Sequence, residues 1–378
     1  MSVRLLDPAA MSPADWPAGS EMLRAYAGGF AERGATRLVA NLRTELRVLH
    51  TGDAVLPVTI NDSDYDNTYV CSPYTAYATY AKEETSLLHD RWWCPALAVL
   101  ADSAGAILKR ARINRMVQVN NWMLSTNLFR RDATWNLDAI TAVLREKFPD
   151  HFICFRSLNA WSDAALLQRF RASGYKLVAS RPVYVFEDFA RTWLRTHNAK
   201  LDRRALARTE FRVIAHDELG EADYERMAEL YRQLYIEKYS RLNPQFTADY
   251  LRLCHRARAM TFFGLRATSG TLDGVLGLFA IDGIVTAPIV GYDTSRDARC
   301  GLYRLLMTLT FDFAMQRGLR LNLSSGAAHF KRLRGGRPQI EYSAIYDRHL
   351  SVSRRLSVSA LAATVNGLGV PLMRKFQL

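Results

Sequence analysis

The residues that could carry chemistry gather in the last third of the chain, close to expected strand ends. Three of them could remove a proton from an amine: Asp293, His329 and Glu341. Histidine alone has an ordinary pKa suited to neutral pH, because a carboxylate needs burial to raise its value. Three tyrosines could return a proton to a leaving group: Tyr292, Tyr303 and Tyr342. Buried tyrosines commonly only pack, so the sequence singles out no one acid or base.

A loop with two arginines and one glycine precedes an expected helix. The loop Arg296-Asp-Ala-Arg-Cys-Gly301 leads into a helix expected to start at Tyr303. A helix N-terminus presents free N–H groups and a positive dipole end to an anion, and Arg296 and Arg299 would add charged contacts to phosphate. The same two arginines could equally be solvated loop residues. The candidate binders of a phosphate-bearing ligand are Arg296, Arg299, Gly301 and Tyr303.

Three carboxylates crowd the segment Asn61-Asp-Ser-Asp-Tyr-Asp-Asn67. Asp64 and Asp66 would suit a cationic amine substrate, although Asp and Asn also form turns by bonding their own backbone. No glycine and glutamate follow at the spacing of a calcium-binding loop. The five cysteines have neither a CxxC spacing nor a histidine at zinc-ligand spacing. No metal site is therefore expected, and the cysteines are typical of reduced thiols in a cytoplasmic protein.

These candidate residues need a scaffold, and the apolar spacing predicts one. In the first half, strands are expected over 44–50, 54–60, 116–124, 151–155 and 175–186, with helices over 75–88, 136–148 and 164–172. In the second half, strands are expected over 211–215, 260–265, 275–281, 284–292, 319–323 and 339–346, with helices over 224–238, 247–257, 303–316 and 327–333. The two halves repeat one layout. The expected class is α/β (α+β), with two tandem domains, each a mixed central sheet flanked by helices.

Length and charge set the domain plan and the partners. The chain has 378 residues, of which 49% are hydrophobic and 23% charged, enough for two domains. A charged stretch from Lys200 to Arg212 marks the boundary. We expect an N-terminal domain over 1–199 with an irregular lead-in over 1–35, a C-terminal domain over 200–350, and a basic tail over 351–378. The net charge of +13 favours an acidic partner such as a nucleic acid, an anionic lipid or a nucleotide-bearing ligand.

No export or membrane-spanning signal is expected. The N-terminus carries a charge and a proline where a signal peptide needs its apolar stretch. There is also no unbroken apolar run of about 18 residues, which a membrane span would need. Cytoplasmic localisation is therefore the expectation, and the oligomeric state stays open.

One stretch carries a family resemblance. It comprises Gly318-Leu-Arg-Leu-Asn-Leu-Ser-Ser-Gly326 and then His329-Phe-Lys-Arg-Leu-Arg-Gly-Gly336. Together with the order of hairpin, strand, loop, helix and strand around it, this stretch resembles the GNAT acyltransferase fold. The resemblance is closest to the subgroup with two tandem GNAT domains, the Fem-type peptidyltransferases and related acyltransferases. It covers roughly residues 40 to 350.

The cofactor loop departs from the family pattern. Ordinary GNAT enzymes have Arg/Gln-x-x-Gly-x-Gly/Ala in this loop, whereas Arg299 stands here in place of one glycine. The corresponding loop of the first half, residues 125–132, has no glycine. The resemblance therefore implies that the second half holds the donor.

The resemblance also implies an activity and roles for residues. It implies an N-acyltransferase that moves an acyl group from a thioester, acyl-coenzyme A or an acyl carrier protein, to the amine of a small molecule or peptide. It places the family's functional Phe-Lys pair on Phe330 and Lys331, beside His329, and the ammonium of Lys331 would stabilise the oxyanion. Candidate substrate-binding residues near the active site are Tyr292, Ser324 and Ser325.

Two other functions fit the same features. The motif and the charge also permit an aminoacyl-tRNA-dependent, Fem-like peptidyltransferase. Alternatively, the chain could be a non-catalytic protein that docks on an anionic membrane or RNA through its tail, Arg348 to Lys375. Leu356, Leu361, Val365 and Leu368 lie between the charges of this tail, as they would in an interfacial helix.

Overall fold

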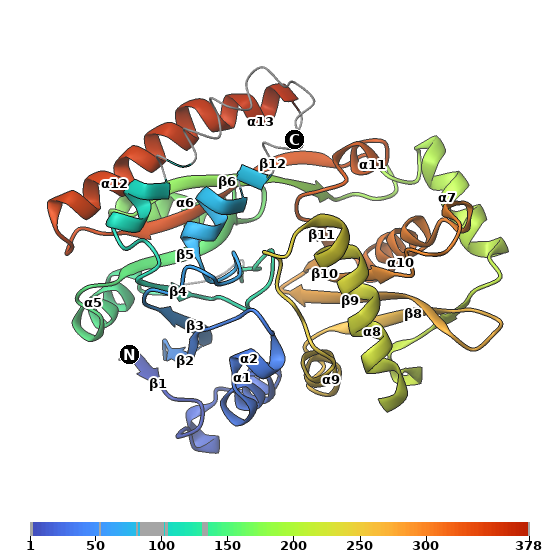
Figure 1. The fold of residues 1–378 in the computed structure, drawn as a ribbon, viewed down its shortest axis with the longest axis horizontal. Helices are drawn as coiled ribbons and strands as arrows, with labels where there is room; N and C mark the ends of the chain where they lie inside the picture. Colours follow the sequence, from blue (N-terminus) through green and yellow to red (C-terminus); the bar gives the residue numbers. More distant parts are fainter. Residues whose placement is uncertain are drawn as a thin grey trace.

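The computed structural model describes residues 3–52, 54–80, 82–83, 102, 105–130 and 135–376. Within these residues the strands form one continuous 12-stranded sheet that spans the molecule (Figure 1). Its order is β1-β2-β3-β4-β5-β12-β6-β11-β10-β9-β8-β7. The mixed α/β class is confirmed. Residues 81 and 84–88 of the helix expected over 75–88, and Arg131 and Asp132 of the first-half loop, lie outside the described residues.

The first half follows the predicted order. Its strands are β1 (Arg4–Leu6), β2 (Glu45–His50), β3 (Val55–Asn61), β4 (Met116–Val119), β5 (Phe152–Asn159) and β6 (Lys176–Phe186). Its helices include α1 (Glu21–Arg33), α2 (Ala35–Leu38), the π-helical segment η2 (Thr75–Thr79), α5 (Leu137–Lys147) and α6 (Ala160–Ala172). The prediction of an irregular lead-in is wrong, because β1 pairs with β2 and α1 buries Tyr26 and Phe30.

The second half also matches its predicted order. Its strands are β7 (Arg212–Ile214), β8 (Thr261–Arg266), β9 (Leu272–Ile281), β10 (Ile284–Tyr292), β11 (Arg320–Asn322) and β12 (Arg337–Tyr346). Its helical elements include α7 (His197–Arg208), α8 (Tyr224–Tyr231), the π-helical η5 (Arg232–Tyr239), α9 (Ala248–Arg256), α10 (Leu302–Gln316) and α11 (Ala328–Arg332). Gly318 follows α10 with φ +64°, a left-handed value that favours glycine and helps to end the helix. The tail is helical: α12 (Val352–Thr364), η7 (Val365–Gly369) and α13 (Val370–Phe376).

The two halves exchange strands at the centre of the sheet. β12, from the end of the second half, lies between β5 and β6 and pairs antiparallel with both. β6, from the first half, lies between β12 and β11 and also pairs antiparallel with both. The sheet therefore has no boundary at residue 199, where the predicted N-terminal domain ends.

Helices cover both faces of the sheet in the second half. Neighbouring residues of β9 point to opposite faces, as the pleat requires: Val275 joins the core under α8 and α9, and Leu276 joins the core under α7 and α10. The four described cysteines, Cys71, Cys154, Cys254 and Cys300, are free thiols.

Candidate active site

The strands β10 and β11 pair briefly and then separate. They form a parallel ladder of three pairs, from Ile284 opposite Arg320 to Thr286 opposite Asn322. β10 then runs on to Tyr292 against β9 alone, with a register shift between Thr286 and Ile289. Residues 287–292 therefore keep one edge with which no other strand of the described chain pairs. We call this the free β10 edge.

Two residues of β10 shape this edge. Pro288 lies within the register shift, where it lacks the N–H that a regular ladder needs. Gly291 lies directly beneath the junction of α8 and η5: a Cβ atom at this position would be 2.5 Å from the backbone nitrogen of Tyr231. Only glycine allows this approach without moving the helix. The junction is also where the π-helical turns of η5 begin, a feature that often accompanies functional sites.

Aromatic side chains surround the end of the free β10 edge. The rings of Tyr292 and Tyr303 lie 6.4 Å apart, and those of Tyr303 and Phe330 lie 5.0 Å apart. These three residues come from β10, α10 and α11, and each is partly buried. Burial raises the pKa of Tyr303, so its phenol stays protonated at neutral pH. Lys238 of η5 places its Nζ atom 3.4 Å from the hydroxyl of Tyr292. The structure thus brings together three of the predicted site residues.

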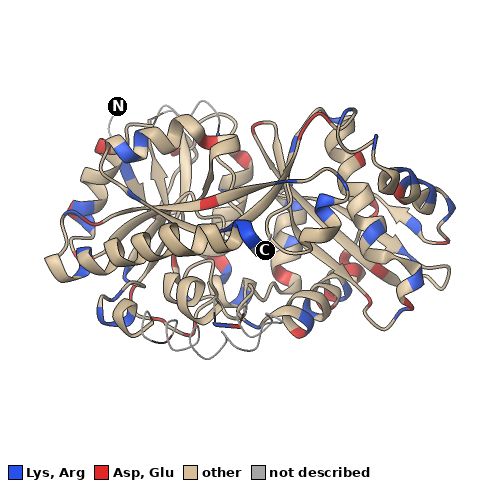
Figure 2. Ribbon diagram, turned by 90° about the horizontal axis from the view of Figure 1, so that it is seen from above, with Lys and Arg blue, Asp and Glu red and all other residues tan. Residues whose placement is uncertain are grey.

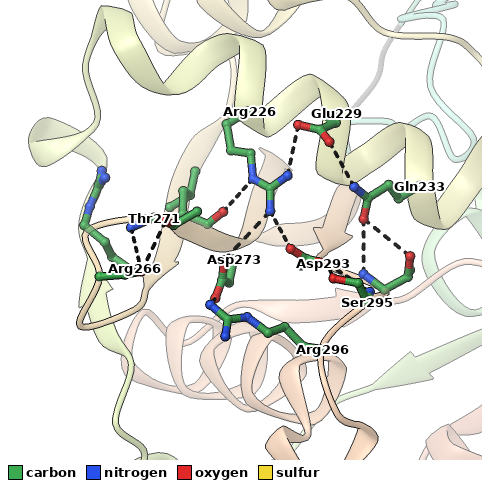
Figure 3. Close-up of polar contacts among 12 residues, drawn as sticks. Arg226, Glu229, Gln233, Arg266, Thr271, Asp273, Asp293, Ser295 and Arg296 are labelled. Atoms are coloured by element: carbon green, nitrogen blue, oxygen red, sulfur yellow. Dashed lines mark hydrogen bonds and ion pairs between the residues drawn. The ribbon is translucent and has the colours of Figure 1, made fainter.

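The loop after β10 is anchored by ion pairs, as Figure 3 shows. Asp273 of β9 is fully buried, and its carboxylate lies 2.6 Å from Arg296 and 3.8 Å from Arg226. Arg226 of α8 also forms an ion pair with Asp293 at 2.7 Å. Arg296 is therefore committed to the fold and is poorly placed to hold a phosphate.

Asp293 is a structural anchor in this network and is poorly suited to act as a base. Partial burial would raise its pKa, but hydrogen bonds from Ser295 and Arg226 outweigh burial and lower it. The carboxylate is therefore ionised and occupied by donors at neutral pH. The sequence singled Asp293 out by its position after a strand and gave no sign of its partner Arg226.

Arg299 lies exposed just before the start of α10. The side chain of Arg299 is 91% exposed, and it pairs with Asp297 of its own loop at 2.7 Å. Gly301 adopts φ +63°, which turns the chain into α10. The first N–H groups of this 15-residue helix have no partner within the helix. The predicted anion site thus keeps Arg299 and the helix N-terminus but loses Arg296.

Lys331 lies beneath the turn that follows β11. Its Nζ atom donates hydrogen bonds to the backbone oxygens of Leu323, Ser324 and Ser325 at 2.7, 3.2 and 2.8 Å. Burial, followed by the charge of Arg181, lowers the pKa of Lys331 to about 7. The turn needs this support, since Ser324 adopts a positive φ of 57°. The side chain of Lys331 thus holds the turn. This role differs from that of the free ammonium which the resemblance implied.

The other predicted residues of this region divide into two groups. Ser324 and Ser325 are partly exposed in the turn that Lys331 holds. His329 on α11 is exposed and forms no ion pair in the described part of the chain. Glu341 is buried on β12 and forms an ion pair with Arg181 at 3.2 Å. Of the three candidate bases, only His329 is free to meet a substrate.

The acidic segment follows β3 and is tied to the residues just before β4. Asn114, just before β4, donates a hydrogen bond to the backbone oxygen of Asp64 at 2.9 Å, and Asp66 is exposed two residues later. The end of β3 that leads into this segment lies beside the starts of β4 and β5 and the last residues of β12. In the described part of the chain, neither Asp64 nor Asp66 contacts the aromatic residues around the free β10 edge. The structure does not bring them together.

In the first half, the corresponding position is filled by the protein itself. β4 ends at Val119, the last residue that pairs with β5. Beyond it, buried Asn121 donates hydrogen bonds to the hydroxyl of Thr59 at 2.8 Å and to the backbone oxygen of Val70 at 3.0 Å. Arg156 of β5 donates to the same oxygen of Val70 at 2.8 Å. These groups leave no free strand edge comparable to that of β10 in the described residues.

A buried ion pair positions α11, and the sequence gave little sign of it. Arg334 donates to both carboxylate oxygens of Asp202 on α7, at 2.6 and 2.9 Å, and both side chains are buried. The guanidinium of Arg334 also lies 3.4 Å from the centre of the Phe330 ring. This pair ties α7 to the helix that carries Phe330 and Lys331. In the sequence, Arg334 lies in the stretch that carries the family resemblance and Asp202 in the charged stretch that marks the predicted boundary.

Comparisons with known proteins give one family match and several structural likenesses. Residues 189–332 match the family model of the acetyltransferase (GNAT) domain. The chain is similar to the structure of L-PGS from Bacillus licheniformis (13% identity, 59% of this chain and 77% of that chain, TM-score 0.44) and to FemX (9%, 56% and 77%, 0.43). It is also similar to a tandem GNAT protein from the clavulanic acid biosynthesis pathway (10%, 91% and 98%, 0.39). None of the curated proteins matches the sequence.

The segment that matches the family model coincides with the candidate site. Residues 189–332 hold the free β10 edge, the loop with Arg299, the start of α10 and the turn held by Lys331. The structural likenesses have TM-scores below 0.5 and carry no argument about substrates.

Proposed function

We propose that this GNAT-type acyltransferase moves an acyl group from acyl-coenzyme A to the amine of a small molecule or peptide, at the end of the free β10 edge. The free edge itself is the observation that carries the proposal. It offers a row of backbone groups to an extended ligand that bears amide groups, such as the arm of an acyl thioester. A catalytically silent chain would have no need to keep this edge open.

The start of α10 supports the choice of a phosphate-bearing donor. A ligand lying along β10 toward Tyr292 comes next to the loop with Arg299 and to the first turn of α10. The helix N-terminus favours negative charge, and an exposed guanidinium adds charged hydrogen bonds to phosphate. Coenzyme A combines an amide-bearing arm with phosphates, so both parts of the site would be used.

The reaction assigns tasks to three features. The amine nitrogen attacks the thioester carbonyl carbon, and backbone N–H groups of the free β10 edge stabilise the oxyanion. His329 takes the proton that the nitrogen loses, because it is the exposed candidate base. Tyr303, whose ring contacts those of Tyr292 and Phe330, gives a proton to the sulfur when the carbon–sulfur bond breaks and regains one from solvent. Lys331 acts as a positioning residue that holds the turn of Ser324 and Ser325 beside the acceptor.

Two alanine variants in the loop distinguish a role in donor binding from a role in the stability of the fold. Arg299→Ala should weaken binding of acetyl-coenzyme A about tenfold, because it removes one charged contact to phosphate. It should leave the thermal midpoint unchanged. Arg296→Ala should lower the free energy of unfolding by about 2 kcal/mol, because buried Asp273 keeps only its more distant partner Arg226. Titration calorimetry and urea unfolding measure the two effects.

The control for this prediction lies at the opposite end of the same helix. Arg317 is exposed and follows α10, so Arg317→Ala removes an equal charge far from the proposed phosphate site. Its donor affinity should equal that of the unaltered protein. Equal affinity of Arg299→Ala and Arg317→Ala would contradict the placement of the donor. A protein that transfers an aminoacyl group from tRNA and binds no acyl-coenzyme A would contradict the choice of donor.

A further inference from the structure

The C-terminal tail forms one long helix on the surface of the molecule. α12, η7 and α13 continue without a break from Val352 to Phe376, and this segment contains no Asp or Glu. Residues Val352–Lys375 are long and apolar enough to cross a membrane by length and composition, with a mean hydropathy of 1.5 over their most apolar window. Only 17% of that window is buried in the protein. A soluble protein core does not account for such a helix.

The inner side of this helix is fixed along the sheet. Val358 and Leu361 are buried in one cluster with Val178 of β6. Asn366 donates a hydrogen bond from its amide to the backbone oxygen of Leu177 at 2.8 Å and accepts one from the backbone nitrogen of Ala179 at 2.9 Å. The helix is therefore held lengthwise on the protein. Crossing a membrane would require it to give up these contacts.

The outer side of the helix is apolar and exposed. Val352 and Leu356 are exposed by 65% and 63%, and Leu368 and Leu372 by 65% and 43%. Each pair is four residues apart, so its members lie on the same side of the helix. Between the pairs, Ala360 and Ala363 are also exposed. In Figure 2 the helix is tan over most of its length, with basic residues near its C-terminal end.

Positive charge accompanies this apolar face. Arg355 and Arg374 are exposed near the two ends of the helix. The neighbouring helical turn at 105–110 buries Leu108 in the same cluster as Val358, while Ile107 is 51% exposed and Arg110 is also exposed. An apolar stripe bordered by cations is the pattern of a helix that lies in the interface of an anionic lipid bilayer.

We infer that the C-terminal helix docks this protein on an anionic lipid surface, with the helix parallel to the membrane plane and Leu356 and Leu368 in the acyl boundary. The charges decide between lipid and a second copy of the chain. A helix without any carboxylate, paired with its own copy, would bring arginines together without compensation. Anionic headgroups would neutralise the same arginines and cover the leucines.

Vesicle sedimentation tests this inference with the full chain. The protein should bind vesicles of phosphatidylglycerol and phosphatidylcholine, and bind pure phosphatidylcholine much more weakly. The variant Leu356→Gln, Leu368→Gln, Leu372→Gln should lose partitioning by a factor on the order of 100, because three leucines no longer enter the bilayer. Its thermal midpoint should stay unchanged, since the replaced side chains are exposed. Leu201→Gln, an exposed leucine on α7, is the matched control and should bind as the unaltered protein does.

Each outcome decides the matter. Equal partitioning of the triple variant and Leu201→Gln would overturn the inference. A full-length protein that binds no anionic vesicle would also overturn it. The same holds if the protein binds no vesicle but forms a dimer in sedimentation velocity, and the triple variant abolishes that dimer. Binding is measured without substrates, so this result is independent of the proposed acyl transfer.

Discussion

Replacing Lys331 with methionine should lower kcat/KM for acyl transfer by on the order of 10²-fold, the loss expected when a site residue moves by about 1 Å. The same change should lower the free energy of unfolding by at least about 2 kcal/mol, because backbone oxygens of Leu323 and Ser325 lose their buried donor. Methionine keeps the apolar stem, so both losses report on the ammonium. Steady-state kinetics well below the unfolding temperature and urea unfolding measure them.

The pairing of the two losses distinguishes two roles for Lys331. A lysine that holds the turn affects stability and rate together, whereas a free ammonium that meets the oxyanion would affect the rate alone. A large loss of rate at unchanged stability would therefore favour the role that the resemblance implied and contradict the geometry. Lys147→Met, on the exposed side of α5, serves as the control and should change neither quantity. Lys331→Arg should recover only part of the rate and part of the stability, because a planar guanidinium cannot meet the same carbonyl oxygens as a compact ammonium does.

Replacing Asp202 with alanine should cause the largest loss of stability among these variants, about 3 to 5 kcal/mol. The change leaves the guanidinium of Arg334 buried without its carboxylate partner. Because Arg334 also contacts Phe330, we expect α11 to lose its position and activity to fall as well. Urea unfolding and the kcat of the folded fraction measure the two effects.

An exposed ion pair provides the comparison for Asp202. Asp217 pairs with Arg258 at 3.2 Å, and both side chains are largely exposed. Asp217→Ala should change the free energy of unfolding by no more than about 1 kcal/mol. If Asp202→Ala costs no more than Asp217→Ala, the buried pair does not position α11.

Elements set by local patterns could be predicted from the sequence. The apolar spacing of α5 and α10 and the alternation in β2 and β3 are properties of short segments, and the structure has these elements within one to two residues of the predicted bounds. The end of α10 is also marked locally, because Gly318 follows it in a left-handed conformation that favours glycine. The exchange of β6 and β12 could not be predicted in this way, because strand pairing across more than 150 residues leaves no local pattern.

The candidate site was predictable in position and less so in detail. The residue types singled out Tyr292 and Tyr303, and the family resemblance singled out Phe330; the structure places these three around the end of β10. Asp273 was missed, although an aspartate inside the apolar strand Leu272–Ile281 is a sign of a buried, paired charge. The contacts of Lys331 depend on a turn with left-handed residues, and a serine at position 324 does not predict such a conformation.

Amide hydrogen exchange with and without acetyl-coenzyme A shows whether the donor lies along the free β10 edge. We expect slower exchange on ligand binding in residues 287–292 and in 301–305 at the start of α10, with little change in residues 116–130 of the first half. Binding that protects residues 116–130, or that leaves 287–292 unprotected, would contradict this placement of the donor.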